Sequence, residues 1–395
     1  MKRVKLLLFL TLLTNLVFAQ KKPIDEFSTI DKKALLLPDS LTKSTVDIAN
    51  YINNNFNTNQ EKVRAIYIWI ATNIQYDIEN MYALNFYEKK EEKISKPLQT
   101  GKGICENFAA LFTDICLKSG IKSFVVEGYT KQNGLADYTP HAWSASLVDS
   151  AWFLFDPTWG SGYASGGKFY KKINNYYFKT PPVSFIKSHM PFDYLWQFLN
   201  YPLSNQEFYD GKTQQNKITS YFDFMDSIQV YEKQSHIDQL ISSVYRIEKN
   251  GIKNSLIYDR LQHLKLEIER DKQNKIVNLY NSASICYNDG INELNEFINY
   301  RNKQFLPKKT DPEIQNMIDV ANNNLKESKT KLEQISDSED NIKIMIKQLS
   351  KSIEDASNYL IEQQSWLNVY FSKSKYGRKS MFYERKVSLF GFPLN

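Results

Sequence analysis

The spacing of apolar residues predicts three helices in the first third of the chain. Apolar positions recur every three or four residues over about 41–56 and again over 60–77, which is the period of amphipathic helices. The same period starts again after Gly103 and stops at Ser119-Gly120, a pair typical of a helix end.

Alternation with a period of two predicts β-strands directly after these helices. The runs SFVVEGYT (123–130), HAWSASLV (141–148) and AWFLFDPT (151–158) are rich in β-branched and aromatic residues. Because Asp149-Ser150 separates the last two runs by two residues, they are expected to form a hairpin. Its expected cross-strand pairs are Val148–Ala151, Trp143–Asp156 and His141–Thr158. A helix followed by antiparallel strands indicates an α+β fold, with the helix packed on the sheet.

The pattern changes beyond about residue 215 to long polar helices rich in Asn, Lys, Glu and Gln. We expect a helical region with a helix pair over 215–306, then a helical hairpin with a basic, aromatic tail over 311–395. Heptad spacing predicts the hairpin, through Ile314, Ile318, Ala321, Leu325, Leu332 and Ile335 and through Ile342, Ile346, Leu349, Ile353, Ala356 and Leu360. This all-α domain would follow an α+β domain over 41–205, with residues 20–40 as a polar linker.

The first nineteen residues predict the compartment. Lys2, Arg3 and Lys5 precede an apolar stretch, and a small-residue site ends at Ala19, as in a cleavable signal peptide over 1–19. We therefore expect a secreted or periplasmic protein with no transmembrane span after cleavage. Removal of these three cations lowers the formal net charge from +6 to +3. A net positive charge this small does not indicate nucleic-acid binding.

The cysteines do not form a disulfide framework. The chain has three, too few for the dense cross-linking of small secreted domains. Cys105 falls in the first turn of the predicted helix, where unsatisfied N–H groups and the helix dipole stabilise a thiolate. Cys116 lies on the same helical face without polar neighbours, and we expect Cys116 and Cys286 to be core residues.

Cys105, His141 and Asp156 have the residue types of a thiol catalytic triad. Such a triad needs a nucleophile, a base within reach of it, and an acid that fixes the imidazole tautomer. In the expected hairpin register, His141 and Asp156 project from one face as diagonal neighbours. Asp149 is the competing acid, but its place at the turn indicates a turn residue. The alternative for His141 alone is a core histidine with satisfied hydrogen bonds.

These motifs resemble the transglutaminase-like superfamily of papain-like cysteine enzymes, and most closely its kyphoscoliosis-peptidase and cytokinesis-protein branch. The resemblance covers a little over a third of the chain. It rests on EKVRAIYIWIATNIQYD (61–77), GICENFAALFTDICLKSGIKSFVVEGYTK (103–131), HAWSASLVDSAWFLFDPTWGSG (141–162) and YFKTPPVSFIKSHMPFDYLWQFL (177–199). One departure is Asn107, where many relatives carry glycine.

The resemblance implies a role for each residue of the triad. Cys105 would be the nucleophile, His141 the general base and acid, and Asp156 the group that orients the imidazole. Gln99 is a candidate oxyanion donor because it lies six residues before the cysteine, as the oxyanion glutamine does in papain-like proteases. Its alternative is a solvated loop amide, and the backbone N–H of Cys105 is the default donor.

Three aromatic or imidazole side chains near the triad have other expected roles. Trp143 and Trp159 are expected to line the cleft and exclude water. His189 has no evident partner in the sequence, so we expect it to be structural.

Two functions are compatible with these features. The first is a thiol enzyme that cleaves or transfers an amide or peptide bond through a cysteine thioester, with hydrolysis favoured over amine transfer. The second is a catalytically silent binding module or scaffold that uses the C-terminal helices. Both take a protein or peptide as substrate or partner. Phosphate-binding loops, zinc-spaced clusters and EF-hand loops are missing from the sequence, so it predicts no cofactor and no metal.

Overall fold

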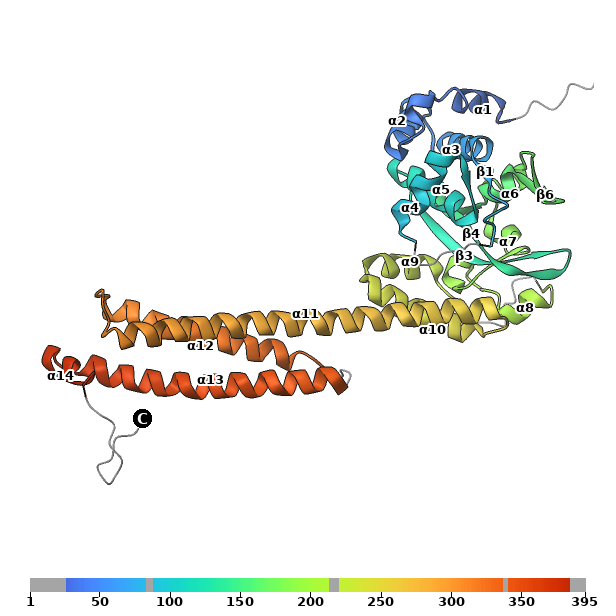
Figure 1. The fold of residues 1–395 in the computed structure, drawn as a ribbon. Coiled ribbons are helices and arrows are strands. Elements are labelled where there is room, and N and C mark those ends of the chain that lie inside the picture. The colour runs from blue at the N-terminus through green and yellow to red at the C-terminus, as the bar shows by residue number, and fades with distance from the viewer. Residues whose placement is uncertain (1–25, 83–87, 213–219, 337–339, 384–395) are drawn as a thin grey trace, which may run out of the picture. The chain divides into compact units, whose positions relative to one another are not determined.

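The computed structural model describes residues 26–82, 88–212, 220–336 and 340–383 (Figure 1). The predicted signal peptide lies outside the described residues. The chain divides into two compact units, Met1–Leu264 and Lys265–Asn395. The division falls inside helix α11 (Ser255–Asn302), whereas the sequence pattern placed the domain boundary between residues 205 and 215.

The first unit combines short helices with an antiparallel sheet. Its α-helices before α11 are α1 (Ser28–Ala34), α2 (Thr45–Asn55), α3 (Asn59–Asn73), α4 (Lys90–Thr100), α5 (Cys105–Lys118), α6 (Pro157–Ser161), α7 (Pro182–Phe185), α8 (Asn205–Tyr209), α9 (Phe224–Lys233) and α10 (His236–Asn250). Short 3-10 turns are η1 (Asp39–Leu41), η2 (Asn175–Tyr177) and η3 (Tyr194–Gln197). Helices α2, α3 and α5 agree with the three helices that the apolar period predicts.

The central sheet has the strand order β5-β4-β3-β8 and is antiparallel. Its strands are β3 (Ser123–Gln132), β4 (Leu135–Val148), β5 (Ala151–Phe155) and β8 (His189–Pro191). Two small sheets accompany it, formed by β1 (Gln75–Tyr76) with β2 (Lys102–Gly103), and by β6 (Gly162–Ser165) with β7 (Lys168–Lys171). The fold is thus the expected α+β arrangement.

Helix α5 packs on β3 and β4, with α2, α3 and α4 around it (Figure 1). A core on this side of the sheet joins Phe108, Phe112 and Ile115 of α5 to Phe155 of β5. The opposite face of the sheet carries a second core with Trp143 at its centre, covered by α7, η3 and α9. Because both faces are buried, the sheet fixes the positions of the side chains at its ends.

The predicted linker over 20–40 contains a helix instead. Helix α1 packs on α3, and its Asp31 binds the buried Arg64 through two hydrogen bonds of 2.6 and 2.7 Å. The Arg64 guanidinium also lies over the ring of Phe27, 4.4 Å from its centroid. The prediction of a linker is wrong for this segment. Its polar composition indicated a solvated chain, but one of the polar residues, Asp31, pairs with a residue 33 positions further on.

The second unit is helical. It contains α11 from Lys265, α12 (Asp311–Glu333), α13 (Asp340–Ser372) and α14 (Lys375–Ser380). Helices α12 and α13 pack against each other, and most of the predicted heptad positions, including Ile318, Leu325 and Ile353, are buried. The predicted break between the two helices lies partly outside the described residues, as does the end of the basic tail.

Helix α11 differs from the predicted helix pair because it runs without interruption for 48 residues. Its Gly290 does not break it. A Cβ atom at that position would meet the Leu325 side chain at 3.0 Å, so the glycine lets α12 approach closely. Among the described residues, no helix is long and apolar enough to span a membrane.

Candidate active site

Cys105 opens helix α5, as the sequence predicts, and is 4% exposed. Asn107 explains why the helix starts here, because its side-chain oxygen accepts from the N–H of Ile104 at 2.9 Å and its amide donates to the carbonyl of Lys93. Asn107 thus caps the helix. The Cys105 side chain packs against Ala142 of β4, the neighbour of His141.

The hairpin that carries His141 has the predicted turn but a shorter ladder. Val148 pairs with Ala151, and Asp149 and Ser150 adopt positive φ angles of 50° and 69°. The ladder ends at Ser144–Phe155, so the expected pairs Trp143–Asp156 and His141–Thr158 do not form. The chain turns at Asp156 into helix α6 because Pro157 cannot donate to the ladder.

Asp156 nevertheless reaches His141, from the N-cap of helix α6. Its Oδ2 atom lies 2.9 Å from Nε2 of His141, and its Oδ1 accepts from the backbone N–H groups of Thr158 and Trp159 at 2.9 and 3.2 Å. The carboxylate is completely buried. The competing Asp149 stays at the turn.

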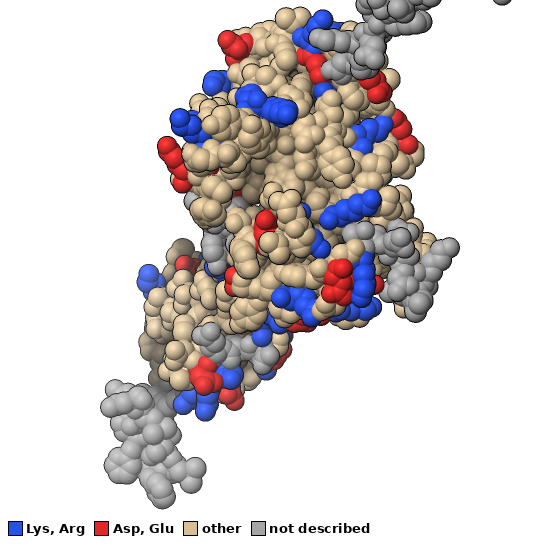
Figure 2. Space-filling view, turned by 90° about the vertical axis from the view of Figure 1, so that its right-hand side faces the viewer, with Lys and Arg blue, Asp and Glu red and all other residues tan. Residues whose placement is uncertain are grey.

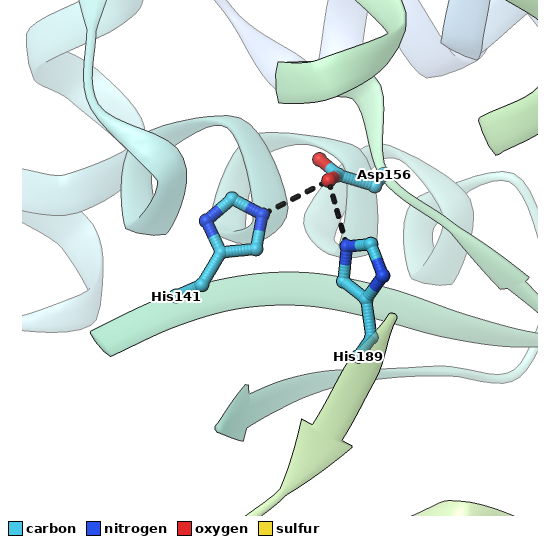
Figure 3. A group of neighbouring side chains, drawn as sticks. All are labelled: His141, Asp156 and His189. Atoms are coloured by element: carbon cyan, nitrogen blue, oxygen red, sulfur yellow. Dashed lines mark hydrogen bonds and ion pairs between the residues drawn. The ribbon is translucent and has the colours of Figure 1, made fainter. Parts of the chain in front are cut away.

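Sequence reasoning expected His189 to be structural and found no partner for it, but the structure gives it one. Its Nε2 lies 3.2 Å from the same Oδ2 of Asp156, and Figure 3 shows the two imidazoles on either side of the carboxylate. Its other nitrogen, Nδ1, lies 2.8 Å from Oγ of Ser188. A partner 33 residues away cannot be recognised from local sequence patterns. The only indication in the sequence that His189 lies near the site was its place in the last segment of the family resemblance.

Burial and the carboxylate of Asp156 act in opposite directions on the pKa of both histidines. Burial lowers the pKa of His141, but the effects of Asp156 and then of Cys105 outweigh burial and raise this pKa to about 10. Burial lowers the pKa of His189 to about 4, so that ring is neutral at physiological pH. Burial raises the pKa of Asp156, while the two histidines lower it by more and hold it well below its ordinary value.

These shifts describe an ionised acid between one basic and one neutral imidazole. In Figure 3, Nδ1 of His141 points away from Asp156. Because a carboxylate only accepts hydrogen bonds, Nε2 of His141 carries a proton. When His141 is neutral, its Nδ1 is therefore available as a base.

The aromatic residues around the site are more buried than expected. Trp159 is half-buried, and its ring lies 5.5 Å from that of His141. Trp143 is only 1% exposed and belongs to the core behind the sheet, 6.1 Å from His141. It therefore supports the imidazole from within instead of lining an open cleft. Tyr76 pairs with Gly103, two residues before Cys105, and burial raises its pKa.

Gln99 is exposed near the end of helix α4, whereas the predicted nucleophile is buried at the start of α5. Gly101, in the left-handed conformation at φ 68°, ends α4 and turns the chain between them. Among the described hydrogen bonds, none joins Gln99 to Cys105, His141 or Asp156. The structure brings His141 and Asp156 together, packs Cys105 against Ala142 next to His141, and leaves the predicted oxyanion donor apart.

The group His141, Asp156 and His189 offers three potential metal-ligand atoms within 4.8 Å of one another. Hydrogen bonding already accounts for these atoms, because each Nε2 faces the carboxylate and not a common point between the three. Two imidazole N–H groups donate to one oxygen of the carboxylate, and these donors satisfy the need of a buried carboxylate for hydrogen bonds.

A helix with a cysteine at its start, packed on an antiparallel sheet with a His–Asp pair, defines the papain-like class of cysteine enzymes with a transglutaminase-like fold. Residues 46–157 match the model of the transglutaminase-like superfamily. The chain therefore carries a transglutaminase-like domain, as its motifs predict.

Kyphoscoliosis peptidase of Mus musculus is 36% identical over 159 residues, which are 38% of this chain and 23% of that protein. Hillarin of Drosophila melanogaster is 26% identical over 208 residues, which are 46% of this chain and 24% of that protein. The chain thus spans about a quarter of the length of these relatives. A crystal structure described as a TGase is 20% identical, with 40% of this chain and 37% of that chain covered and a TM-score of 0.23.

Proposed function

We propose that this protein is a thiol enzyme that cleaves or transfers an amide or peptide bond through a thioester on Cys105. The observation that carries the proposal is the buried His141–Asp156 pair, joined at 2.9 Å, with Cys105 packed against Ala142, the residue next to His141 on β4. A raised histidine pKa beside a thiol favours the thiolate–imidazolium pair. The start of helix α5 adds the positive end of a helix dipole.

Each residue has a role in the proposed reaction. The Cys105 thiolate attacks the carbonyl carbon, and a C–S bond forms as the carbonyl oxygen takes the electron pair. His141 then donates its Nδ1 proton to the leaving amine as the C–N bond breaks. Water, deprotonated by His141, or a second amine attacks the thioester and releases Cys105. Asp156 holds the imidazole in the required tautomer throughout.

We favour hydrolysis and a protein or peptide substrate. The kyphoscoliosis peptidase relatives are named as peptidases, which supports this choice. The face in Figure 2 carries cationic and anionic side chains interspersed around a largely uncharged centre. Such a surface suits a polypeptide better than a polyanion. We place the enzyme outside the cytoplasm on the basis of its N-terminal sequence, and assign partner docking to the C-terminal helices.

Iodoacetamide labelling of the purified full-length chain near neutral pH tests the nucleophile. We expect Cys105 to be alkylated well before the other two thiols. Cys116 is fully buried, and burial raises its pKa. Cys286 is the relevant competitor because Lys331 Nζ lies 3.3 Å from its sulfur. Mass mapping of the labelled peptides measures the order.

Two variants complete the test. Cys286→Ser should leave the labelling of Cys105 unchanged, whereas His141→Ala should slow it strongly because the thiolate loses its counter-ion. If Cys105 resists labelling in the folded protein, the thiol-enzyme proposal is wrong and the binding-module alternative is preferred. A peptide library with and without an amine donor then separates hydrolysis from transfer.

A further inference from the structure

We propose that His189 is a positioning residue for the reaction of Cys105, acting through Asp156. This inference rests on the proposed function. Asp156 Oδ2 faces both Nε2 of His141 and Nε2 of His189, at 2.9 and 3.2 Å, so one oxygen atom links the two rings. The sequence predicted His189 to be structural, but a structural histidine does not require this particular partner.

Packing holds His189 in one orientation. The side chain is 1% exposed and surrounded by aromatic rings. The ring of Phe185 is stacked on it with centroids 4.0 Å apart, and the edge contacts of Trp159 and Trp143 are at 4.7 and 5.2 Å. An imidazolium would be poorly solvated in such surroundings, so the ring acts as a neutral hydrogen-bond donor.

The hydrogen bonds of His189 determine its tautomer. Because ionised Asp156 can only accept, Nε2 carries the proton and Nδ1 is the acceptor for the Ser188 hydroxyl, 2.8 Å away. Ser188, His189 and Asp156 thus form a directed chain of donors that ends on the carboxylate. His141 donates to the same oxygen (Figure 3).

The backbone of β8 fixes this series of hydrogen-bond donors relative to the sheet. His189 pairs with Thr130 of β3, and Pro191 pairs with Gly128. A Cβ atom on Gly128 would lie 2.1 Å from the carbonyl oxygen of Met190, so the absence of a side chain there allows β8 to lie against β3. The position of His189 follows from strand pairing as well as from side-chain packing.

The consequence is that Asp156 cannot rotate. Its Oδ1 is held by the N-terminus of helix α6, and its Oδ2 is directed at His141 with His189 as the second donor. The other ionisable groups near His189 are Asp137, which accepts from Thr130, and Tyr177, whose ring lies 5.9 Å away. Neither takes the place of His189 on the carboxylate.

The test compares alkylation rates of Cys105 across pH in four variants of the full chain. His189→Phe keeps a ring in the aromatic box and removes both nitrogens. His189→Gln keeps an N–H donor, and Ser188→Ala removes the hydroxyl that donates to Nδ1 of His189. His236→Gln is the matched control, because that histidine is exposed on α10.

We expect His189→Phe to slow alkylation about tenfold near neutral pH, the size of effect expected from losing one hydrogen bond to a charged group. His189→Gln should recover most of the rate, Ser188→Ala should lose part of it, and His236→Gln should match the unchanged protein. Thermal unfolding of each variant separates this loss from misfolding. A purely structural role would instead make the rate follow stability, with no rescue by glutamine.

An unchanged or faster alkylation rate in folded His189→Phe would overturn the inference. A rate that does not distinguish His189→Gln from His189→Phe would also overturn it. Both results leave the proposed function intact as long as Cys105 of the unchanged protein reacts first. Failure of Cys105 to react in the unchanged protein refutes the proposed function itself, so the two failures are distinguishable.

Discussion

At the scale of single residues, Asp156 is the centre of the site. It is completely buried, yet it stays ionised because two imidazole rings and two backbone N–H groups donate to it. An unpaired carboxylate in that position would be strongly disfavoured. The four donors therefore stabilise the fold and set the tautomer of His141 at the same time.

Asp156→Asn should separate these two contributions. The amide oxygen can still accept from Thr158 and Trp159, and its NH2 group would then face both histidine rings. His141 must then carry its proton on Nδ1, which is the wrong tautomer for accepting a proton from Cys105. We expect alkylation of Cys105 to fall by at least about a hundredfold, with a loss of about 1–3 kcal/mol in unfolding free energy.

Asp149→Asn is the matched control for that change. Asparagine tolerates the positive φ of 50° at this turn, so stability should change by less than about 0.5 kcal/mol. Alkylation should not change. Loss of alkylation in Asp149→Asn, with full reactivity in Asp156→Asn, would show that the wrong acid has been assigned.

The pH dependence of stability should have two limbs, one from each histidine. The pKa of His189 is depressed from 6.5 to about 4, so the unfolded chain takes up a proton first and stability falls as the pH drops from about 6.5 to about 4. The pKa of His141 is raised to about 10, so its contribution is complete below about 6.5 and is lost as the pH rises through about 10.

Unfolding in urea at a series of pH values, followed by tryptophan fluorescence, measures both limbs. Five of the six tryptophans precede Leu264, so fluorescence mainly reports the first unit. His189→Gln should flatten the acid limb and His141→Gln the alkaline limb, each by about 1–3 kcal/mol. The assignments would be wrong if His189→Gln flattened the alkaline limb and His141→Gln the acid limb, or if neither variant changed either limb.

At the scale of elements, a buried ion pair adds to the apolar packing that holds helix α1 on the core. Asp31 forms a two-bond ion pair with Arg64, which is 1% exposed. Arg64 also donates to Asn175 of η2 at 2.7 Å. The guanidinium thus joins the segment before the transglutaminase-like domain to the segment that follows α6 and β7.

Asp31→Ala should destabilise the first unit by about 3 kcal/mol, because it leaves a buried guanidinium with only part of its partners. Lys32→Ala changes the exposed neighbour on the same helix and should have little effect. Urea unfolding followed by tryptophan fluorescence measures both. Equal stability of the two variants would mean that the Asp31–Arg64 ion pair contributes nothing to the fold.

At the scale of the whole molecule, the two units have separate cores. The second is built from α11, α12 and α13 around Phe297, Ile318 and Leu325. All of the residues proposed for catalysis lie in the first unit. The chemistry of Cys105 should therefore be independent of the packing of the second unit.

Leu325→Ala tests this independence. Leu325 is 1% exposed, and its truncation should cost about 2–5 kcal/mol in the second unit. Circular dichroism should show earlier melting of helix, while the alkylation rate of Cys105 stays the same. A parallel loss of Cys105 reactivity would show that the units are coupled. Lys326→Ala, at the neighbouring exposed position, is the control for both measurements.

Local patterns were sufficient to predict the parts of the fold that depend on neighbours in sequence. The apolar period located α2, α3, α5, α12 and α13, and the two-residue turn at Asp149-Ser150 set the start of the hairpin. Cys105 at the start of a helix followed from the same kind of evidence. These features depend on backbone hydrogen bonds and side chains within a few residues.

The tertiary structure decided the contacts between residues distant in sequence. Asp156 meets His141 from a helix N-cap and not across a ladder, and His189 joins them because β8 pairs with β3. Trp143 and α1 were likewise misjudged, since their burial depends on segments that pack over them. Sequence periodicity specifies which face of an element is apolar, but only packing of the whole unit determines which polar side chains share a buried carboxylate.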